Sequence, residues 1–186
     1  HAKSQSVMIT VTIPNLDTIL RQLPDEKKAR TVLMRAINRS ATSGKTVASK
    51  AVRAEYILKA AKVKEATKVT KASTSSLEST IKWTGKQMNV ADYRITPKVR
   101  PKKRSKRQMT VEVKKGSKAT YKGAFIGKGG KVFRRTSKKR LPIKPIYGPS
   151  VSQLMGADKV RTEIQKRTLE VLIKRVDHEV ARMLGR

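Results

Sequence analysis

The concentration of positive charge in the middle of the chain is the feature that most limits how this sequence can fold. Residues 94–144 contain 20 Lys and Arg residues and one acidic residue, within a chain of 45 basic and 13 acidic residues. Repulsion among so many like charges opposes a compact isolated monomer and attracts polyanions. The partners compatible with this charge are DNA, RNA, an anionic membrane or an acidic protein.

The apolar content predicts a lean core within a single domain of 186 residues. Hydrophobic residues make up 37% of the chain, below the globular norm of about 45–50%. Cysteine is absent, which excludes disulfides and thiolate metal ligands. No apolar run approaches the roughly 18 residues that a membrane span requires, so we expect no membrane partner.

Residues 1–72 predict one strand followed by helices. Apolar residues alternate with polar or small ones near the N-terminus, at Val7, Ile9, Val11 and Ile13. This spacing is typical of a half-buried strand within residues 1–14. Residues 15–72 have a helical pattern, with a long helix that begins near Pro24 and Asp25 and a second basic helix from Tyr56 to Lys71. Proline suits the first turn of a helix, and an acid suits its positive end.

Residues 77–147 form a basic, β-rich part with short strands. The expected strands are Leu77–Trp83, Tyr93–Ile95, Met109–Val113, Ala124–Ile126 and Val132–Arg134. Gly129 and Gly130 tolerate positive φ, so residues 128–131 predict a hairpin turn. The charged stretch near 98–107 predicts a mobile loop. Prolines 142, 145 and 149 favour an edge strand and a bend into the next helix, because proline cannot donate to a β-ladder.

Residues 150–186 predict C-terminal helices with an apolar face. That face contains Val160, Ile164, Leu172, Val176, Val180 and Leu184. Together the segments predict a single α+β domain. In it, a small antiparallel β-sheet or partial barrel packs with a long N-terminal helix and a long C-terminal helix, and a basic loop extends from it.

Two glycine-containing motifs resemble nucleotide-binding loops but lack the required context. In Ser43–Thr46 (SGKT), Arg39 stands where a phosphate-binding loop requires a glycine. Gly44 more plausibly permits close helix packing. The segment 127–130 lies between strands, whereas a dinucleotide fingerprint joins a strand to a helix. The acids are scattered, the chain has two histidines, and no nucleophile is grouped with a base. We therefore predict no catalytic residues, no metal and no cofactor.

The basic residues of the middle region are the candidate contacts for a polyanion. They are Arg94, Lys98, Arg100, Lys102, Lys103, Arg104, Lys106, Arg107, Arg134, Arg135, Lys138, Lys139 and Arg140. Lys and Arg neutralise phosphates without a fixed motif. No zinc finger, basic zipper or aromatic-rich RNA platform is present, so sequence-specific reading is not indicated. The same residues also suit acidic patches on protein neighbours, and the two interpretations stay open.

Two stretches of the chain carry patterns that are specific in combination. Residues 122–151 (KGAFIGKGGKVFRRTSKKRLPIKPIYGPSV) contain Gly-Ala-Phe, a Gly turn, an Arg-rich strand, an Arg-x-Pro-Ile step and a Gly-Pro before a short helix. Residues 35–52 (RAINRSATSGKTVASKAV) form an early helix with small residues, and residues 63–68 (VKEATK) fit the same region. In this order the stretches resemble the prophage minor tail protein Z family of long-tailed bacteriophages.

The resemblance implies a structural virion protein without enzymatic activity. It implies a tail-completion protein at the head-proximal end of the tail, present in the host cytoplasm during assembly. Such a protein assists tail maturation, head–tail joining and DNA passage. Its implied partners are terminator, tube and connector proteins, and it forms a homo-oligomeric ring, often a hexamer, with non-specific DNA contact. The alternative is a free basic protein that binds nucleic acid without sequence preference.

Overall fold

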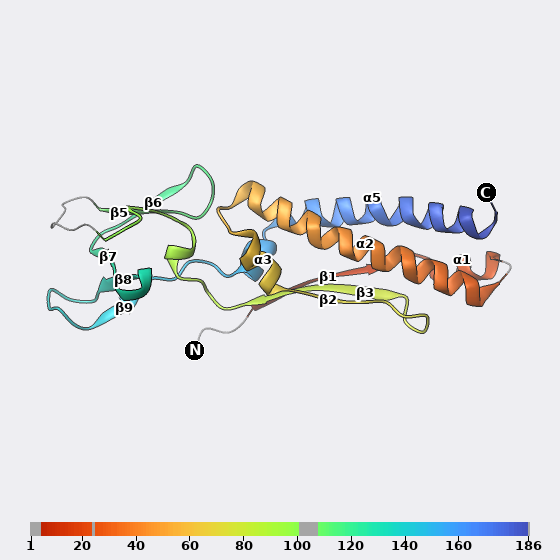
Figure 1. Ribbon diagram of the computed structural model, residues 1–186, viewed down its shortest axis with the longest axis horizontal. Helices are drawn as coiled ribbons and strands as arrows, with labels where there is room; N and C mark the ends of the chain where they lie inside the picture. Colours follow the sequence, from red (N-terminus) through yellow and green to blue (C-terminus); the bar gives the residue numbers. More distant parts are fainter. Residues whose placement is uncertain (1–4, 24, 101–107, 186) are drawn as a thin grey trace.

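The computed structural model describes residues 5–23, 25–100 and 108–185. Figure 1 shows an elongated molecule, with the long helices α2 (Glu26–Glu55) and α5 (Asp158–Met183) at one end and a group of short strands at the other. We call residues 5–85 together with 151–183 the helical lobe, and residues 89–147 the β lobe. The predicted α+β class, with a long helix near each end of the chain, is confirmed.

A three-stranded antiparallel sheet forms one layer of the helical lobe. Its order is β1 (Gln5–Thr12), β3 (Glu78–Gly85), β2 (Thr67–Thr70), and Ile9 pairs with Ile81, which in turn pairs with Val69. Alternate side chains of β1 and β3 are buried, as their periodicity predicts. Trp83 has no exposed surface and is the largest fully buried side chain.

The two long helices lie side by side over this sheet (Figure 1). The apolar face of α5 is buried from Val160 to Leu172, whereas Leu184 lies exposed past the end of the helix. A short helix, α1 (Leu16–Gln22), precedes α2, and α4 (Val151–Met155) precedes α5. No helix in the described part of the chain has the length and apolar character needed to cross a membrane.

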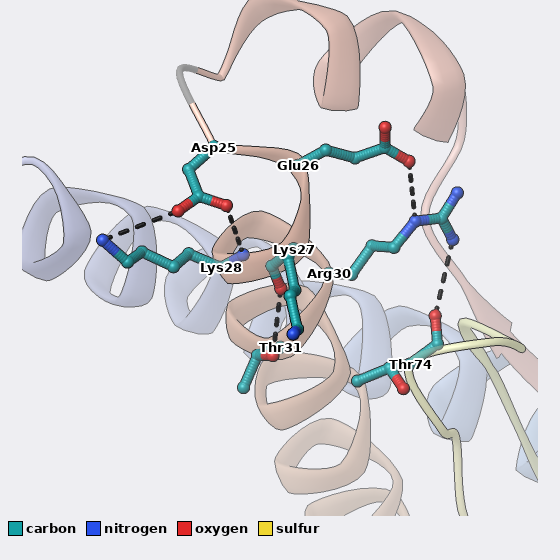
Figure 2. A network of polar contacts seen from close by, with 7 residues as sticks. All are labelled: Asp25, Glu26, Lys27, Lys28, Arg30, Thr31 and Thr74. Atoms are coloured by element: carbon teal, nitrogen blue, oxygen red, sulfur yellow. Dashed lines mark hydrogen bonds and ion pairs between the residues drawn. The ribbon is translucent and has the colours of Figure 1, made fainter.

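The first turn of α2 is capped and tied to the sheet by polar contacts. The Asp25 carboxylate accepts a hydrogen bond of 3.0 Å from the Lys28 amide, as an N-cap residue should. This bond lowers the pKa of Asp25 below its usual value. Arg30 contacts Glu26 at 2.9 Å and donates to the Thr74 carbonyl in the loop before β3 (Figure 2). The predicted helix start near Asp25 is confirmed, while Pro24 lies outside the described residues.

Gly44 permits the close approach of α2 and α5. A Cβ atom at this position would lie 2.8 Å from Thr168 Oγ1 and 2.9 Å from Ile81 Cδ1. Any side chain would therefore push α2 away from both α5 and β3. The SGKT segment lies in the middle of a helix, which confirms the packing role and removes the phosphate-loop geometry.

The helix predicted from Tyr56 to Lys71 is wrong at both ends. Helix α3 covers only Ala60–Ala66, and Thr67–Thr70 forms the edge strand β2. Pairing with β3 explains the difference, because it offers the β-branched residues of Thr67–Thr70 a half-buried position in a sheet. A local apolar stripe cannot reveal a pairing partner that lies farther along the chain.

In the described part of the β lobe the strands form two three-stranded antiparallel sheets, so these strands form neither one continuous sheet nor a partial barrel. In chain order the strands are β4 (Arg94–Thr96), β5 (Met109–Glu112), β6 (Lys118–Tyr121), β7 (Ala124–Ile126), β8 (Val132–Arg135) and β9 (Ile143–Pro145). The predicted hairpin turn is confirmed, with φ of 76° at Gly129 and 74° at Gly130. Pro145 lies on an edge strand, as predicted.

Candidate nucleic-acid interface

The single acidic residue of the 94–144 stretch already has hydrogen-bond donors inside the β lobe. Glu112, on β5, is 5% exposed and accepts 2.8 Å and 3.2 Å hydrogen bonds from the Gly116 amide and the Arg94 guanidinium. The Gly116 amide, and then Arg94, hold the pKa of Glu112 below its usual value. This carboxylate therefore offsets the charge of Arg94, and the stretch holds no second acid for its other cations.

Among the described residues, the hairpin formed by β8 and β9 presents the densest group of predicted contact residues. Arg134 and Arg135 lie on β8, and all of residues 134–144 are exposed. Lys138, Lys139 and Arg140 lie in the loop that joins the two strands. Five of the sequence-predicted residues, which are neighbours in the sequence, thus lie on one exposed hairpin.

Strand register adds a residue that the sequence interpretation missed. Lys144, on β9, pairs directly with Arg134 on β8. Like charges placed opposite each other on neighbouring strands destabilise a sheet. An anion between Arg134 and Lys144 would relieve that repulsion. In the sequence, the available signal for this pair was that residues 134 and 144 stand on either side of a turn that contains Thr and Ser. The strand register shows that the two residues are direct partners.

Aromatic contacts support the base of this hairpin. Phe125, on β7, stacks with Phe133, on β8, with ring centroids 6.2 Å apart, and the Arg135 guanidinium lies 5.1 Å above the Phe125 ring. Gly127 makes room for this packing, because a Cβ there would lie 2.7 Å from the Phe133 ring. These contacts between β7 and β8 therefore hold the base of the hairpin in its three-stranded sheet.

The remaining predicted contact residues fall into three groups: one in an ion pair, two exposed, and five outside the described residues. Arg94 is engaged with Glu112. Lys98 and Arg100 are exposed in the segment after β4. Five predicted residues lie outside the described part of the chain: Lys102, Lys103, Arg104, Lys106 and Arg107. The predicted mobility of the 98–107 loop stays a prediction for the same reason.

A buried asparagine fixes the β7–β8–β9 sheet to the start of the β lobe. Asn89 is 9% exposed, donates to the Val132 carbonyl at 3.1 Å and accepts from the Val132 amide at 2.9 Å. Its side chain also accepts from the Ala91 amide, which caps the short 3-10 turn Val90–Asp92. Asn89 thus gives the buried Val132 amide a partner and shares the Val132 carbonyl with the Ile146 amide.

Tyr93 joins the 3-10 turn that Asn89 caps to the segment through which the chain re-enters the helical lobe. Its hydroxyl donates a 2.6 Å hydrogen bond to the Pro149 carbonyl, one residue before the Ser150 cap of α4. Burial raises the pKa of Tyr93 above its usual value. Gly148 lies against the ring, where a Cβ would lie 2.9 Å from Tyr93 Cε2. The β lobe is therefore connected to the helical lobe by a packed joint.

The arrangement of the hairpin suits electrostatic binding of anions. Within residues 5–23, 25–100 and 108–185, no three His, Cys, Asp or Glu side chains gather as metal ligands. The hairpin offers guanidinium and ammonium groups that can bind anionic oxygens by charge-assisted hydrogen bonds. Its chemistry is that of a surface for phosphates or carboxylates.

Comparison with known proteins gives one match. The sequence model of the family described as prophage minor tail protein Z (GPZ) matches residues 12–186, which is nearly the whole chain. No curated protein and no solved structure matches. The match includes both long helices and the β8–β9 hairpin, and it begins at the last residue of β1.

Proposed function

Since the chain belongs to the prophage minor tail protein Z family, we propose that it completes the phage tail at the head-proximal end. As a member of this family it is a structural protein of the phage tail and part of the virion. In the proposed role it matures the tail for joining to a head and for the passage of DNA. The role is structural and needs no catalytic group. The observation that carries the proposal is the family match over residues 12–186.

The proposal includes a homo-oligomeric ring, with six subunits as the favoured number, that contacts terminator, tube and connector proteins. Two features of the chain support an assembled state. The net charge of +32 opposes a compact isolated subunit. In addition, Met8 on an edge strand, and Leu169 and Ile173 on α5, are each about half exposed, which suits contact with neighbouring subunits. Subunits would assemble in the host cytoplasm.

Deletion of the gene from the phage tests the proposal. We expect lysates with assembled tails that join heads poorly or yield particles that fail to deliver DNA. Electron microscopy would count joined and unjoined tails, and plaque titres would measure infectivity. A plasmid copy of the gene should restore both. Normal head joining together with normal infectivity in the deletion phage would contradict the proposal.

A second candidate is a free basic protein that binds nucleic acid. The exposed cations of the β8–β9 hairpin favour this interpretation, because they need no assembly to bind phosphates. The two candidates differ in where the protein is found. A monomer that co-purifies with nucleic acid and is absent from purified virions would favour the second candidate, whereas a ring retained in purified tails favours the first.

A further inference from the structure

We propose that the β8–β9 hairpin, residues 132–145, binds the phosphate backbone of duplex DNA without sequence preference. This inference deepens the proposed function, because it assigns the DNA contact of a tail-completion protein to one element. It also stands as a biochemical property that can be measured on the purified chain. The argument depends on the charge, the shape and the composition of the hairpin.

The charge of the hairpin is uncompensated. Residues 134–144 (RRTSKKRLPIK) contain six cations and no acid. The ion pairs found among the described residues involve none of these six, whereas the helical lobe pairs Arg30, Arg167 and Lys159 with glutamates. Cations without acidic neighbours retain their full attraction for phosphates.

The shape of the hairpin is that of a short arm with an ordered tip. The Thr136 amide and hydroxyl both donate to the Pro142 carbonyl, at 3.2 Å and 3.1 Å, and the Lys139 amide donates to Ser137 Oγ at 3.3 Å. These bonds close the loop and place its basic residues at the tip. Figure 1 shows this loop at the end of the molecule far from the C-terminus of α5. A two-stranded ribbon fits the major groove of duplex DNA.

The composition favours phosphate over an acidic protein surface. Three of the six cations are lysines, and lysine is depleted at protein–protein interfaces, whereas phosphate contacts use it freely. Residues 132–145 contain no Asn, Gln, Asp or Glu, the side chains that read adenine or cytosine, so base reading by the hairpin is limited to what its Arg, Lys, Thr and Ser side chains can contact. Its phosphate contacts position a protein on a duplex without specifying its sequence.

The test is a salt titration of DNA binding by the purified full-length chain. A fluorescent mixed-sequence duplex of about 20 base pairs is titrated by anisotropy between roughly 50 and 300 mM salt. The tip variant combines Lys138→Gln, Lys139→Gln and Arg140→Gln. Loss of three phosphate contacts should weaken binding on the order of 100-fold near 0.1 M salt and reduce the slope of log K against log salt by about 2 to 3.

The matched control removes the same charge from the helical lobe. It combines Lys27→Gln, Lys166→Gln and Lys174→Gln, three exposed helix residues that are not among the described ion pairs. We expect this variant to keep the wild-type slope. Circular dichroism and thermal melting of both variants would verify that each is folded. A separate variant, Arg134→Gln with Lys144→Gln, should reduce the slope by up to about 2, because it removes two phosphate contacts on the strands.

Several results would overturn the inference. Equal losses in the tip and control variants would show that total charge, not the hairpin, binds DNA. An unchanged slope in the tip variant would exclude these contacts. Competition by poly-glutamate as effective as that by duplex DNA, charge for charge, would identify acidic protein as the partner. If the tip variant loses DNA binding while the deletion phage joins heads and infects normally, the proposed function fails and this inference stands.

Discussion

The two lobes of this protein differ in how their cations are paired with acids and in the size of their buried side chains. In the helical lobe, α2 and α5 pack on a sheet around Trp83, Ile81 and Ile164, which have no exposed surface. Its cations are interleaved with acids, as in the pairs of Arg167 with Glu163 and Glu170. In the β lobe the strands are three or four residues long, and the sole acid of residues 94–144 is used internally.

This difference indicates that the helical lobe provides most of the stability, whereas the β lobe provides positive charge for binding. A lobe whose core includes Trp83 and whose helices carry several ion pairs can supply most of the folding free energy. The β lobe buries smaller side chains, such as Val90 and Val132, and the cations of its β8–β9 hairpin are in none of the described ion pairs, so their charge is available to a partner. The following predictions test whether stability and charge are separated in this way.

The largest expected effect comes from the core of the helical lobe. Trp83→Ala should lower the free energy of unfolding by about 4 kcal/mol, because it removes a fully buried indole and leaves a cavity. The corresponding change in the β lobe, Phe133→Ala, should cost about 1 to 2 kcal/mol, because that ring is only half-buried. Urea unfolding of the two variants measures both values. Equal losses would mean that the cores do not differ in depth.

The next largest effect concerns two asparagines, one in each lobe, whose side chains each bond both the backbone amide and the backbone carbonyl of one distant residue. Asn89→Ala should cost about 2 to 3 kcal/mol, because it removes the side-chain partner of the buried Val132 amide, the cap of the Ala91 amide and one of two hydrogen bonds to the Val132 carbonyl, which still accepts from the Ile146 amide. The partly buried Asn38 bonds the amide and carbonyl of Ala72 in the same way, at 2.8 Å and 3.0 Å. Asn38→Ala should cost less, about 1 to 2 kcal/mol, because water can reach the freed groups.

Amide hydrogen exchange locates these two effects. In Asn89→Ala the amides of β7 and β8 should exchange faster while those of α2 keep their protection. In Asn38→Ala the change should be confined to β2 and the segment that follows it. Uniform acceleration in either variant would show that the lobes unfold as one unit rather than separately.

The smallest expected effect is a pH dependence set by Glu112. Because the folded-state pKa of Glu112 is lowered, its stabilising contribution is complete above the usual value of 4.5 and is lost as pH falls through the folded-state value. Glu112→Gln should therefore be less stable than wild type at neutral pH, and the difference should shrink as pH falls below about 4.5. Thermal melting from neutral to acid pH measures this. A difference that stays constant with pH would contradict the assigned role.

Much of the fold was predictable because its signals are local. The alternation in β1 and β3, the acidic cap of α2 and the adjacent glycines of the β7–β8 turn each depend on neighbouring residues, and the structure has them where predicted. Strands β2 and β6 were missed because TKVT and KATY are too short and polar to show a pattern of their own. They become strands only by pairing with β3 and β5.

The candidate site was predictable in its residues but not in its grouping. The sequence identified thirteen basic residues as equivalent contacts. The structure separates Arg94, which binds Glu112, from the exposed cations of the β8–β9 hairpin. It also adds Lys144 through the strand register. A list of charges cannot contain this distinction, because an ion pair across 18 positions depends on how two strands are aligned.

The excess of positive charge, its concentration in residues 94–144, the two long helices and the glycine turn can all be read from the amino-acid sequence alone. Each follows from composition or from a periodicity of a few residues. Folding in three dimensions places most of that charge in the β lobe, pairs one acid with Arg94 inside that lobe, and lets Asn89 bond β8 from 43 positions away. These features depend on contacts between distant segments, whose free energy is realised only when the chain has folded around them.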